Sequence, residues 1–141
     1  MQTLKQRIFE LAKTPQLMNL ATLSEAGEPR VRYVVGSADE ELTLRFSTHL
    51  DSVKVKELRS NRRVAVTMGA TNTRSSVWLQ VEGEAEVLTD EAERRAFWFE
   101  GLKAHFTGLG DPQYCVVRIS PTSIALGSEV WRPLTPAGTS V

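Results

Sequence analysis

Asp51, Ser52 and Lys54 stand at the predicted start of a short basic helix, and their side chains suit the binding of a phosphate group. The first backbone N–H groups of a helix have no partner within the helix, and the helix dipole adds partial positive charge there. Ser52 would add a hydroxyl group and Lys54 an ammonium group in the same turn. The alternative is that Asp51 caps the helix and the other two side chains are solvated. The local chemistry alone favours this alternative, because short basic helices are common.

Strand-like segments on both sides would place this helix start at the edge of a sheet. Residues 42–47 alternate between apolar and polar side chains, which is the period of a half-buried strand, and residues 64–68 resume a strand. Leu50 and Val55 fit a hydrophobic staple around an N-cap at Asp51. The helix is therefore predicted to be a short crossover that begins just beyond the end of a strand.

The remaining segments predict short strands joined mostly by tight turns, with roughly six or seven strands and about three helices in all. The expected elements are an N-terminal helix within residues 1–15, a hairpin over residues 17–36, a strand over residues 77–88 with a bend at Gly83, a helix capped by Asp90 that continues to Leu102, and strands over residues 114–120 and 123–126. Strands at this spacing favour a closed antiparallel barrel with flanking helices over a parallel sheet. Residues 135–141 are predicted to be a mobile tail.

The composition indicates one domain over residues 1–141 and argues against several classes of partner. The 17 basic side chains balance the 17 acidic ones, so no overall charge recruits nucleic acid or an anionic membrane. The single cysteine, Cys115, excludes an internal disulfide and fits a reducing compartment. No apolar segment approaches the length of a membrane span, and we expect a cytoplasmic protein.

Other residue types that could do chemistry do not form recognisable sites. His49 and His105 stand apart from other potential ligands, so the sequence predicts no metal site. Cys115 lies in an apolar run and is interpreted as a small core residue. The arginines within residues 59–63 have no interleaved aromatic side chains, which argues against nucleic-acid binding.

Two residues outside the helix start stay open as candidates for a functional role. Gln80 is polar in the middle of a long predicted strand, where its amide needs a partner if it is buried. Trp131 lies in a loop-like tail among polar residues, whereas most tryptophans belong to a core or an interface.

The order of these segments resembles the FMN-binding split β-barrel proteins of the pyridoxamine 5′-phosphate oxidase superfamily, especially the general stress protein branch. The matching runs are GEPRVRYVV, LTLRFSTHLDSVKVKELRSNRRVAV and VWLQVEGEAEVL. The segment FWFEGLKAHFTGLGDPQYCVVRISP resembles the helix–loop–strand that precedes the last strand in that branch. The resemblance extends from about Leu17 to Trp131, and it lies in the order and spacing of the segments rather than in one motif.

The resemblance implies a mainly β split-barrel fold and a homodimer with FMN bound at the subunit interface. It also implies which residues contact the cofactor. Arg32, Ser52 and Lys54 would lie at the phosphate, and Val34 and Gln80 at the flavin ring. Phe46, Ser47 and Thr48 would line the cofactor. Trp131 would close the site, either from the same subunit or from the partner subunit.

Three departures from the oxidases argue against pyridoxamine 5′-phosphate as the substrate. Val53 replaces an arginine at the phosphate, Ser37 replaces a lysine that contacts the vitamin, and the tail lacks the arginine- and histidine-rich substrate motif. The resemblance therefore favours an FMN-dependent oxidoreductase of another substrate, with no side chain assigned as catalytic. Two alternatives remain: a non-catalytic carrier or stress sensor for flavin or another phosphorylated ligand, and a ligand-free interaction domain of the same fold.

Overall fold

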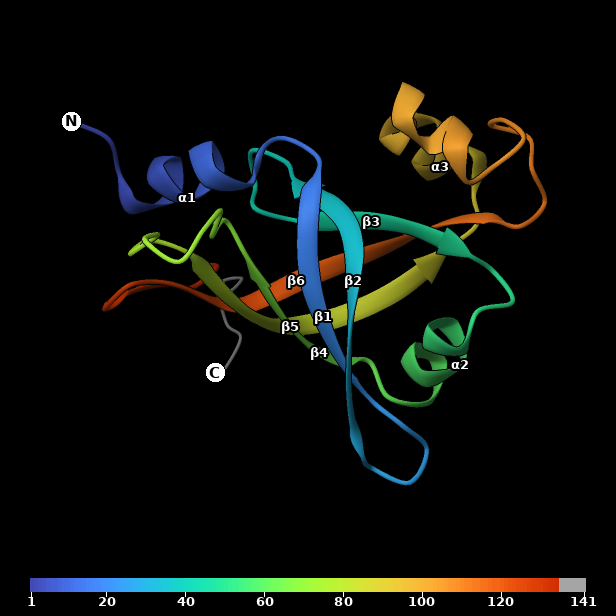
Figure 1. Ribbon diagram of the computed structural model, residues 1–141, viewed down its shortest axis with the longest axis horizontal. Coiled ribbons are helices and arrows are strands. Elements are labelled where there is room, and N and C mark those ends of the chain that lie inside the picture. The colour runs from blue at the N-terminus through green and yellow to red at the C-terminus, as the bar shows by residue number, and fades with distance from the viewer. Residues whose placement is uncertain (135–141) are drawn as a thin grey trace.

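Seven antiparallel strands form one sheet that closes on itself (Figure 1). The computed structural model describes residues 1–134, so the tail predicted over residues 135–141 lies outside the described residues. The strand order is β3-β2-β1-β4-β5-β6-β7, and β3 also pairs with β6 and closes the barrel. The strands are β1 (Gln16–Leu23), β2 (Pro29–Ala38), β3 (Leu44–His49), β4 (Arg63–Met68), β5 (Leu79–Leu88), β6 (Tyr114–Leu126) and β7 (Glu129–Trp131). The mainly β barrel predicted from the sequence is confirmed.

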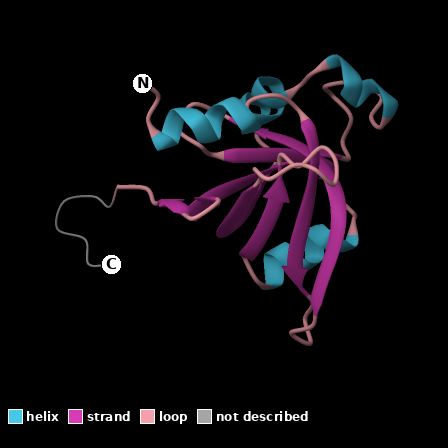
Figure 2. Cartoon of the chain, turned by 60° about the vertical axis from the view of Figure 1, so that its left-hand side comes forward, coloured by secondary structure: helices cyan, strands magenta, loops and turns pink. Residues whose placement is uncertain are grey.

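Two helices lie at opposite ends of the barrel, and a third helical segment lies beside it (Figure 2). The helices are α1 (Leu4–Ala12), α2 (Val53–Ser60), α3 (Glu91–Phe97) and the short 3₁₀ helix η1 (Glu100–Ala104). A capping box between Thr3 and Gln6 starts α1, which then buries Ile8 in the core. Helix α2 buries Leu58 in the same core. Within residues 1–134, no helix combines the length and apolar character needed to cross a membrane.

Apolar side chains at alternating strand positions fill the barrel interior. On β3 the alternation buries Leu44 and Phe46 and leaves Arg45 and Ser47 partly exposed, as the sequence predicts. The same period runs along β5, where the buried positions alternate with exposed glutamate and glutamine side chains. This alternation fixes which residues of each strand can contribute to a site on the outside of the barrel.

Strand β3 begins two residues later than predicted because Leu42 belongs to the preceding turn. Leu42 has a left-handed backbone (φ 65°), and its N–H donates to the carbonyl oxygen of Asp39 at 2.9 Å. The Asp39 carboxylate also accepts from the backbone N–H groups of Glu41 and Thr43. The Asp39 side chain therefore extends the acidic turn to Thr43.

Strand β6 is continuous where the sequence predicts two shorter strands. Pro121 has no N–H to donate, but it lies opposite Gly83, next to the register shift between Glu82 and Gly83 on β5. A Cβ atom on Gly83 would lie 2.5 Å from the carbonyl oxygen of Ser120. The bend predicted at Gly83 is therefore a bulge that lets β6 continue past its proline.

The helix predicted from Asp90 to Leu102 is interrupted after Phe97. Asp90 caps α3 as predicted, through its side chain and the N–H of Glu93. No residue of α3 is buried, however, and the chain is extended at Trp98 before η1 begins and buries Leu102.

Polar contacts attach α3 to the barrel in place of apolar packing. Glu93 pairs with Arg45 of β3 at 3.0 Å and with Arg118 of β6 at 3.3 Å. Arg94 donates to the carbonyl oxygen atoms of Leu109 and Asp111. The predicted apolar positions of this segment divide between two environments: Ala92 and Ala96 are exposed, whereas Phe97, Phe99 and Leu102 belong to a small apolar cluster with Phe106 and Tyr114. One continuous helix therefore does not form.

Replacement of Gly83 by alanine tests the bulge. The added methyl group has no room beside Ser120, so Gly83→Ala should lower the free energy of unfolding by about 1–3 kcal/mol in urea denaturation. Gly108→Ala is the matched control, because no atom lies within 4 Å of its added Cβ. Equal stability of the two variants would show that the close approach of β5 and β6 is readily relieved.

Candidate functional site

The start of α2 differs from the sequence prediction in its capping residue. Ser52, with extended backbone, is the N-cap, and Asp51 belongs to the turn before it. The N–H of Asp51 donates to the side chain of Gln113, which is distant in the sequence, and this contact shifts the helix start by one residue. The predicted staple of Leu50 and Val55 around Asp51 is therefore wrong, although Val55 is buried. The Ser52 hydroxyl makes no capping hydrogen bond and lies 3.3 Å from the Thr48 hydroxyl.

Lys54 brings a partly buried positive charge to this helix start. Its Nζ atom donates to the Thr48 hydroxyl at 2.7 Å, and it has no carboxylate partner within residues 1–134. Burial, followed by the positive charge of Arg32, lowers the pKa of Lys54. An anion beside Lys54 would favour the charged ammonium form and so offset both the burial and the repulsion from Arg32.

Arg32 lies close enough to affect Lys54, but its guanidinium group is already engaged. It donates to the Thr22 hydroxyl at 2.6 Å and to Oε1 of Glu57 at 2.8 Å. Arg30 contacts Oε2 of the same carboxylate at 2.6 Å, and the Glu57 side chain is only 5% exposed. This buried cluster ties α2 to the β1–β2 hairpin.

A cavity of about 280 Å³ extends from Lys54 between β2, β3 and η1. It brings together four of the residues predicted from the family resemblance, namely Val34, Ser47, Thr48 and Lys54. Its far wall consists of residues that the prediction did not include, mainly Phe99, Leu102, His105 and Phe106, together with His49 on β3. The dense aromatic spacing of the segment FWFEGLKAHF was the available signal for this wall.

The other predicted site residues lie outside this cavity. Ser52 and Arg32 flank Lys54 as described, and the Phe46 side chain is fully buried in the barrel core. Gln80 is exposed on β5, so its amide does not require a protein partner. Trp131 belongs to β7 opposite Ile124 and packs partly against the core, so the prediction of a loop around it is wrong.

The His49 ring of the cavity wall contacts two residues that are distant in the sequence. Nε2 of His49 lies 3.1 Å from the carbonyl oxygen of His105, and the His49 ring stacks on Phe106 with a centroid distance of 4.6 Å. The part of the chain that the structure describes contains no cluster of three or more metal-ligating side chains.

Cys115 is fully buried opposite Thr48, which confirms its interpretation as a core residue. Its Sγ atom lies 3.3 Å from the Thr48 carbonyl oxygen. Burial raises the pKa of its thiol, so the reactive thiolate form is disfavoured.

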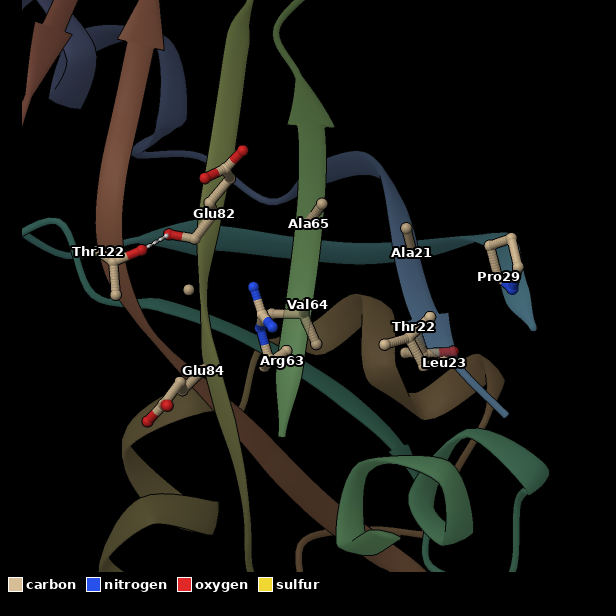
Figure 3. Close-up of a pocket in the computed structure, with 11 residues that line it drawn as sticks. Ala21, Thr22, Leu23, Pro29, Arg63, Val64, Ala65, Glu82, Glu84 and Thr122 are labelled. Atoms are coloured by element: carbon tan, nitrogen blue, oxygen red, sulfur yellow. Dashed lines mark hydrogen bonds between the residues drawn. The ribbon is translucent and has the colours of Figure 1, made fainter. Parts of the chain in front are cut away.

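A second hollow, of about 490 Å³, lies on the outer face of β1, β4 and β5 (Figure 3). Glu82, Glu84 and Arg63 line it beside the bulge at Gly83, and the Thr122 hydroxyl donates to the Glu82 carbonyl oxygen. This hollow contains none of the predicted cofactor residues. The helix start at Lys54 and its adjoining cavity remain the better candidate site.

Comparison with known proteins identifies the family. A sequence model described as pyridoxamine 5′-phosphate oxidase matches residues 4–126. The chain belongs to this family. Within the pyridoxamine 5′-phosphate oxidase family, a pyridoxine/pyridoxamine 5′-phosphate oxidase from Xylella fastidiosa is 34% identical over 93 residues, which are 61% of this chain and 45% of the relative. The corresponding protein from Burkholderia thailandensis is 30% identical over 103 residues, which are 73% of this chain and 47% of the relative. The chain thus spans less than half the length of these curated relatives.

Solved structures confirm the fold. General stress protein 26 from Bacillus anthracis superposes with a TM-score of 0.82 at 24% identity and covers 92% of this chain and 98% of its own. A Clostridium acetobutylicum protein related to general stress protein 26 gives a TM-score of 0.70 at 20% identity, over 89% of this chain and 84% of its own. At these identities the similarity establishes the split-barrel architecture.

Replacement of Glu57 by glutamine tests the buried cluster. Burial opposes ionisation of Glu57, but hydrogen bonds from Thr22 and Arg32 and the charges of Arg32 and Arg30 hold its pKa below the ordinary value of 4.5. The charge therefore stabilises the fold above about pH 4.5, and this contribution is lost as the pH falls through the folded-state pKa. Glu57→Gln should lower the free energy of unfolding by about 1–3 kcal/mol at pH 7.

The difference between wild type and Glu57→Gln should shrink in acid, as measured by thermal unfolding at a series of pH values. Glu41→Gln is the matched control, because Glu41 makes only an exposed pair with Lys5. A Glu57→Gln effect of equal size at pH 7 and at pH 3 would contradict the assignment of an ionised, stabilising carboxylate.

Proposed function

We propose that this protein binds FMN with the phosphate at the start of α2. The observation that carries the proposal is Lys54, a partly buried ammonium group without a carboxylate partner among the described residues. The hydroxyl groups of Thr48 and Ser52 and the free N–H groups of the first helical turn adjoin it. Charged hydrogen bonds from these groups would hold a phosphate monoester.

The cavity next to Lys54 suits the remainder of a flavin. Val34, on β2, lines one side of the cavity, and Phe99 and Phe106 line the opposite side. Apolar and aromatic surfaces of this kind bind planar rings, and a few polar groups orient them. The matches to pyridoxine/pyridoxamine 5′-phosphate oxidases support the same ligand class, although the chain covers less than half of those proteins.

An FMN-dependent oxidoreductase with a substrate other than pyridoxamine 5′-phosphate is the function we infer. FMN, when bound, supplies the redox chemistry, while the protein binds it, orients it and limits the access of water. Ser37 lies outside the cavity, beside Arg45 and Phe97, and Val53 adds no charge at the helix start. Within residues 1–134, Lys54 is the only lysine or arginine that lines the cavity, so a substrate phosphate would lack a second cation there.

A carrier or sensor that binds flavin without catalysis is the second candidate function. Its support comes from the structure of the cavity lining: no aspartate or glutamate of the described residues lines it, and the His49 ring is held against the His105 carbonyl oxygen and Phe106, which leaves the His105 side chain as the main candidate acid or base. An assay with NADPH as the electron donor, FMN on the protein and a quinone as the acceptor separates the candidates, with free FMN as the control: NADPH oxidation in repeated cycles above that control supports the oxidoreductase, and FMN binding without it supports the carrier.

We also infer that the protein forms a homodimer through the outer face of β1 and β2. Leu17, Val31 and Tyr33 are each more than 60% exposed on this face. Burial of such a patch is the usual reason for self-association. Tyr33 also borders the cavity, and Gln80 lies on the same outer face, three strands away with β1 and β4 in between. A two-fold axis on this face would bring Gln80 of the second copy toward the flavin.

The single buried cysteine also fits the cytoplasmic location that we expect.

Replacement of Lys54 by alanine tests the phosphate site. Because a charged hydrogen bond is typically worth about 1.5–3 kcal/mol, Lys54→Ala should weaken FMN binding roughly tenfold to a hundredfold in a fluorescence-quenching titration. Riboflavin, which lacks the phosphate, should bind both proteins alike. Lys56→Ala, an exposed position on the same helix, is the matched control. An equal loss of FMN and riboflavin affinity would show that Lys54 acts through the fold and not through the phosphate.

Replacement of Val31 by glutamate tests the dimer. A charge within the apolar face should convert the dimer to a monomer at micromolar concentration in sedimentation equilibrium, because burying an unpaired carboxylate is strongly unfavourable. Ala92→Glu places the same charge at an exposed position of α3 and should leave the dimer intact. A monomeric wild-type protein would refute the proposed assembly.

A further inference from the structure

Glu57 lies on the buried side of α2, and both oxygen atoms of its carboxylate have polar partners. Oε1 accepts from Thr22 at 2.8 Å and from Arg32 at 2.8 Å, and Oε2 pairs with Arg30 at 2.6 Å. Glu57 follows Lys54 by three residues on α2, so both side chains project from neighbouring positions of one helix. The single buried acid of this region therefore lies beside the cations that a phosphate would need.

Arg32 is the cation that Glu57 affects most directly. Its two terminal nitrogens contact Thr22, Glu57 and, at 3.4 Å, the Leu20 carbonyl oxygen, while Nε makes no hydrogen bond among the described residues. A guanidinium group has five N–H donors, so Arg32 retains donors that no described residue uses. Its net charge, however, is offset by the carboxylate that it contacts.

We propose that Glu57 determines how strongly this site holds a phosphate, because it offsets the charge of Arg32 and leaves Lys54 as the main cation. This inference rests on the proposed binding of FMN and concerns a residue to which the family resemblance assigns no role. A phosphate monoester carries nearly two negative charges at pH 7, so one added or removed charge in a partly buried site changes its affinity strongly.

The consequence is a site with moderate affinity for the phosphate group. The arginine is kept in place by its contact with Glu57, while its attraction for a dianion is reduced. A site of this kind lets FMN exchange with solution more readily than a site with two unopposed cations. Glu57 is thus a specificity-determining residue that sets the preference for FMN over riboflavin.

Glu57→Gln separates charge from position. The glutamine side chain has nearly the same shape, and its amide oxygen can still accept from Arg32 or Thr22. The affinity for FMN should rise about tenfold relative to the affinity for riboflavin, measured by fluorescence titration of the folded, full-length protein. A structural role alone predicts the opposite result, an equal loss for both flavins.

Two further variants show that the gain depends on charge and on Arg32. Glu57→Asp keeps the negative charge and should keep the wild-type preference, and Arg32→Met combined with Glu57→Gln should remove the gain. If Glu57→Gln does not fold, Arg30→Gln combined with Glu57→Gln keeps the net charge of the cluster but leaves Arg32, the arginine that acts on Lys54, without its carboxylate partner; the preference for FMN should then rise, by less than in Glu57→Gln alone. An unchanged or reduced preference for FMN in the folded variants would overturn the inference.

A second measurement keeps this inference distinct from the proposed function. Inorganic phosphate should raise the thermal unfolding midpoint more in Glu57→Gln than in the wild type, relative to sodium chloride of equal ionic strength. If this occurs while neither protein binds FMN, the role of Glu57 stands and the flavin proposal fails. If the wild type binds FMN but Glu57→Gln shows no larger response to phosphate and no higher FMN preference, the flavin proposal stands and the role of Glu57 is refuted.

Discussion

Pairing of β3 with β6 is the constraint on which the rest of the structure depends. Six consecutive residue pairs, from Leu44 with Ile119 to His49 with Tyr114, join segments about 70 residues apart and close the barrel. This closure places Thr48 at the end of β3 beside the start of α2, and it places the chain before Tyr114 next to the same strand end. The groups around Lys54 and the aromatic wall therefore meet because the two strands meet. Loss of this register would separate them even if every helix still formed.

Much of the architecture could be predicted from local patterns in the sequence. Alternation of apolar and polar residues identified β3 and β5, Asp90 was correctly identified as a cap, and Gly83 marked the bulge. These features depend on residues that are close in the chain. The prediction failed where a distant residue decides the local structure. Gln113 binds the backbone of Asp51 and moves the cap to Ser52, and the bulge opposite Pro121 makes β6 a single strand.

The candidate site shows the same division between local and distant effects. Helix physics made Lys54 and Ser52 candidates, although local chemistry alone favoured a merely capped helix, and the structure joins both to Thr48. The engagement of Arg32 by Glu57 could not be selected, because the residues lie on a strand and a helix that are 25 positions apart. A family resemblance gives the position of an arginine but not the charge that surrounds it. The structure adds that Arg32 is paired with a buried carboxylate.

The attachment of α3 gives the cavity two walls of different physical character. The barrel wall is held by buried apolar side chains, whose cohesion varies little with dissolved salt. The segment that carries α3 and η1 is attached in large part through the Glu93 ion pairs and the Arg94 contacts, although Leu102 and Phe106 add a small apolar cluster. Ionic strength weakens partly exposed ion pairs selectively. We therefore expect dissolved salt to weaken the attachment of this segment more than the packing of the barrel.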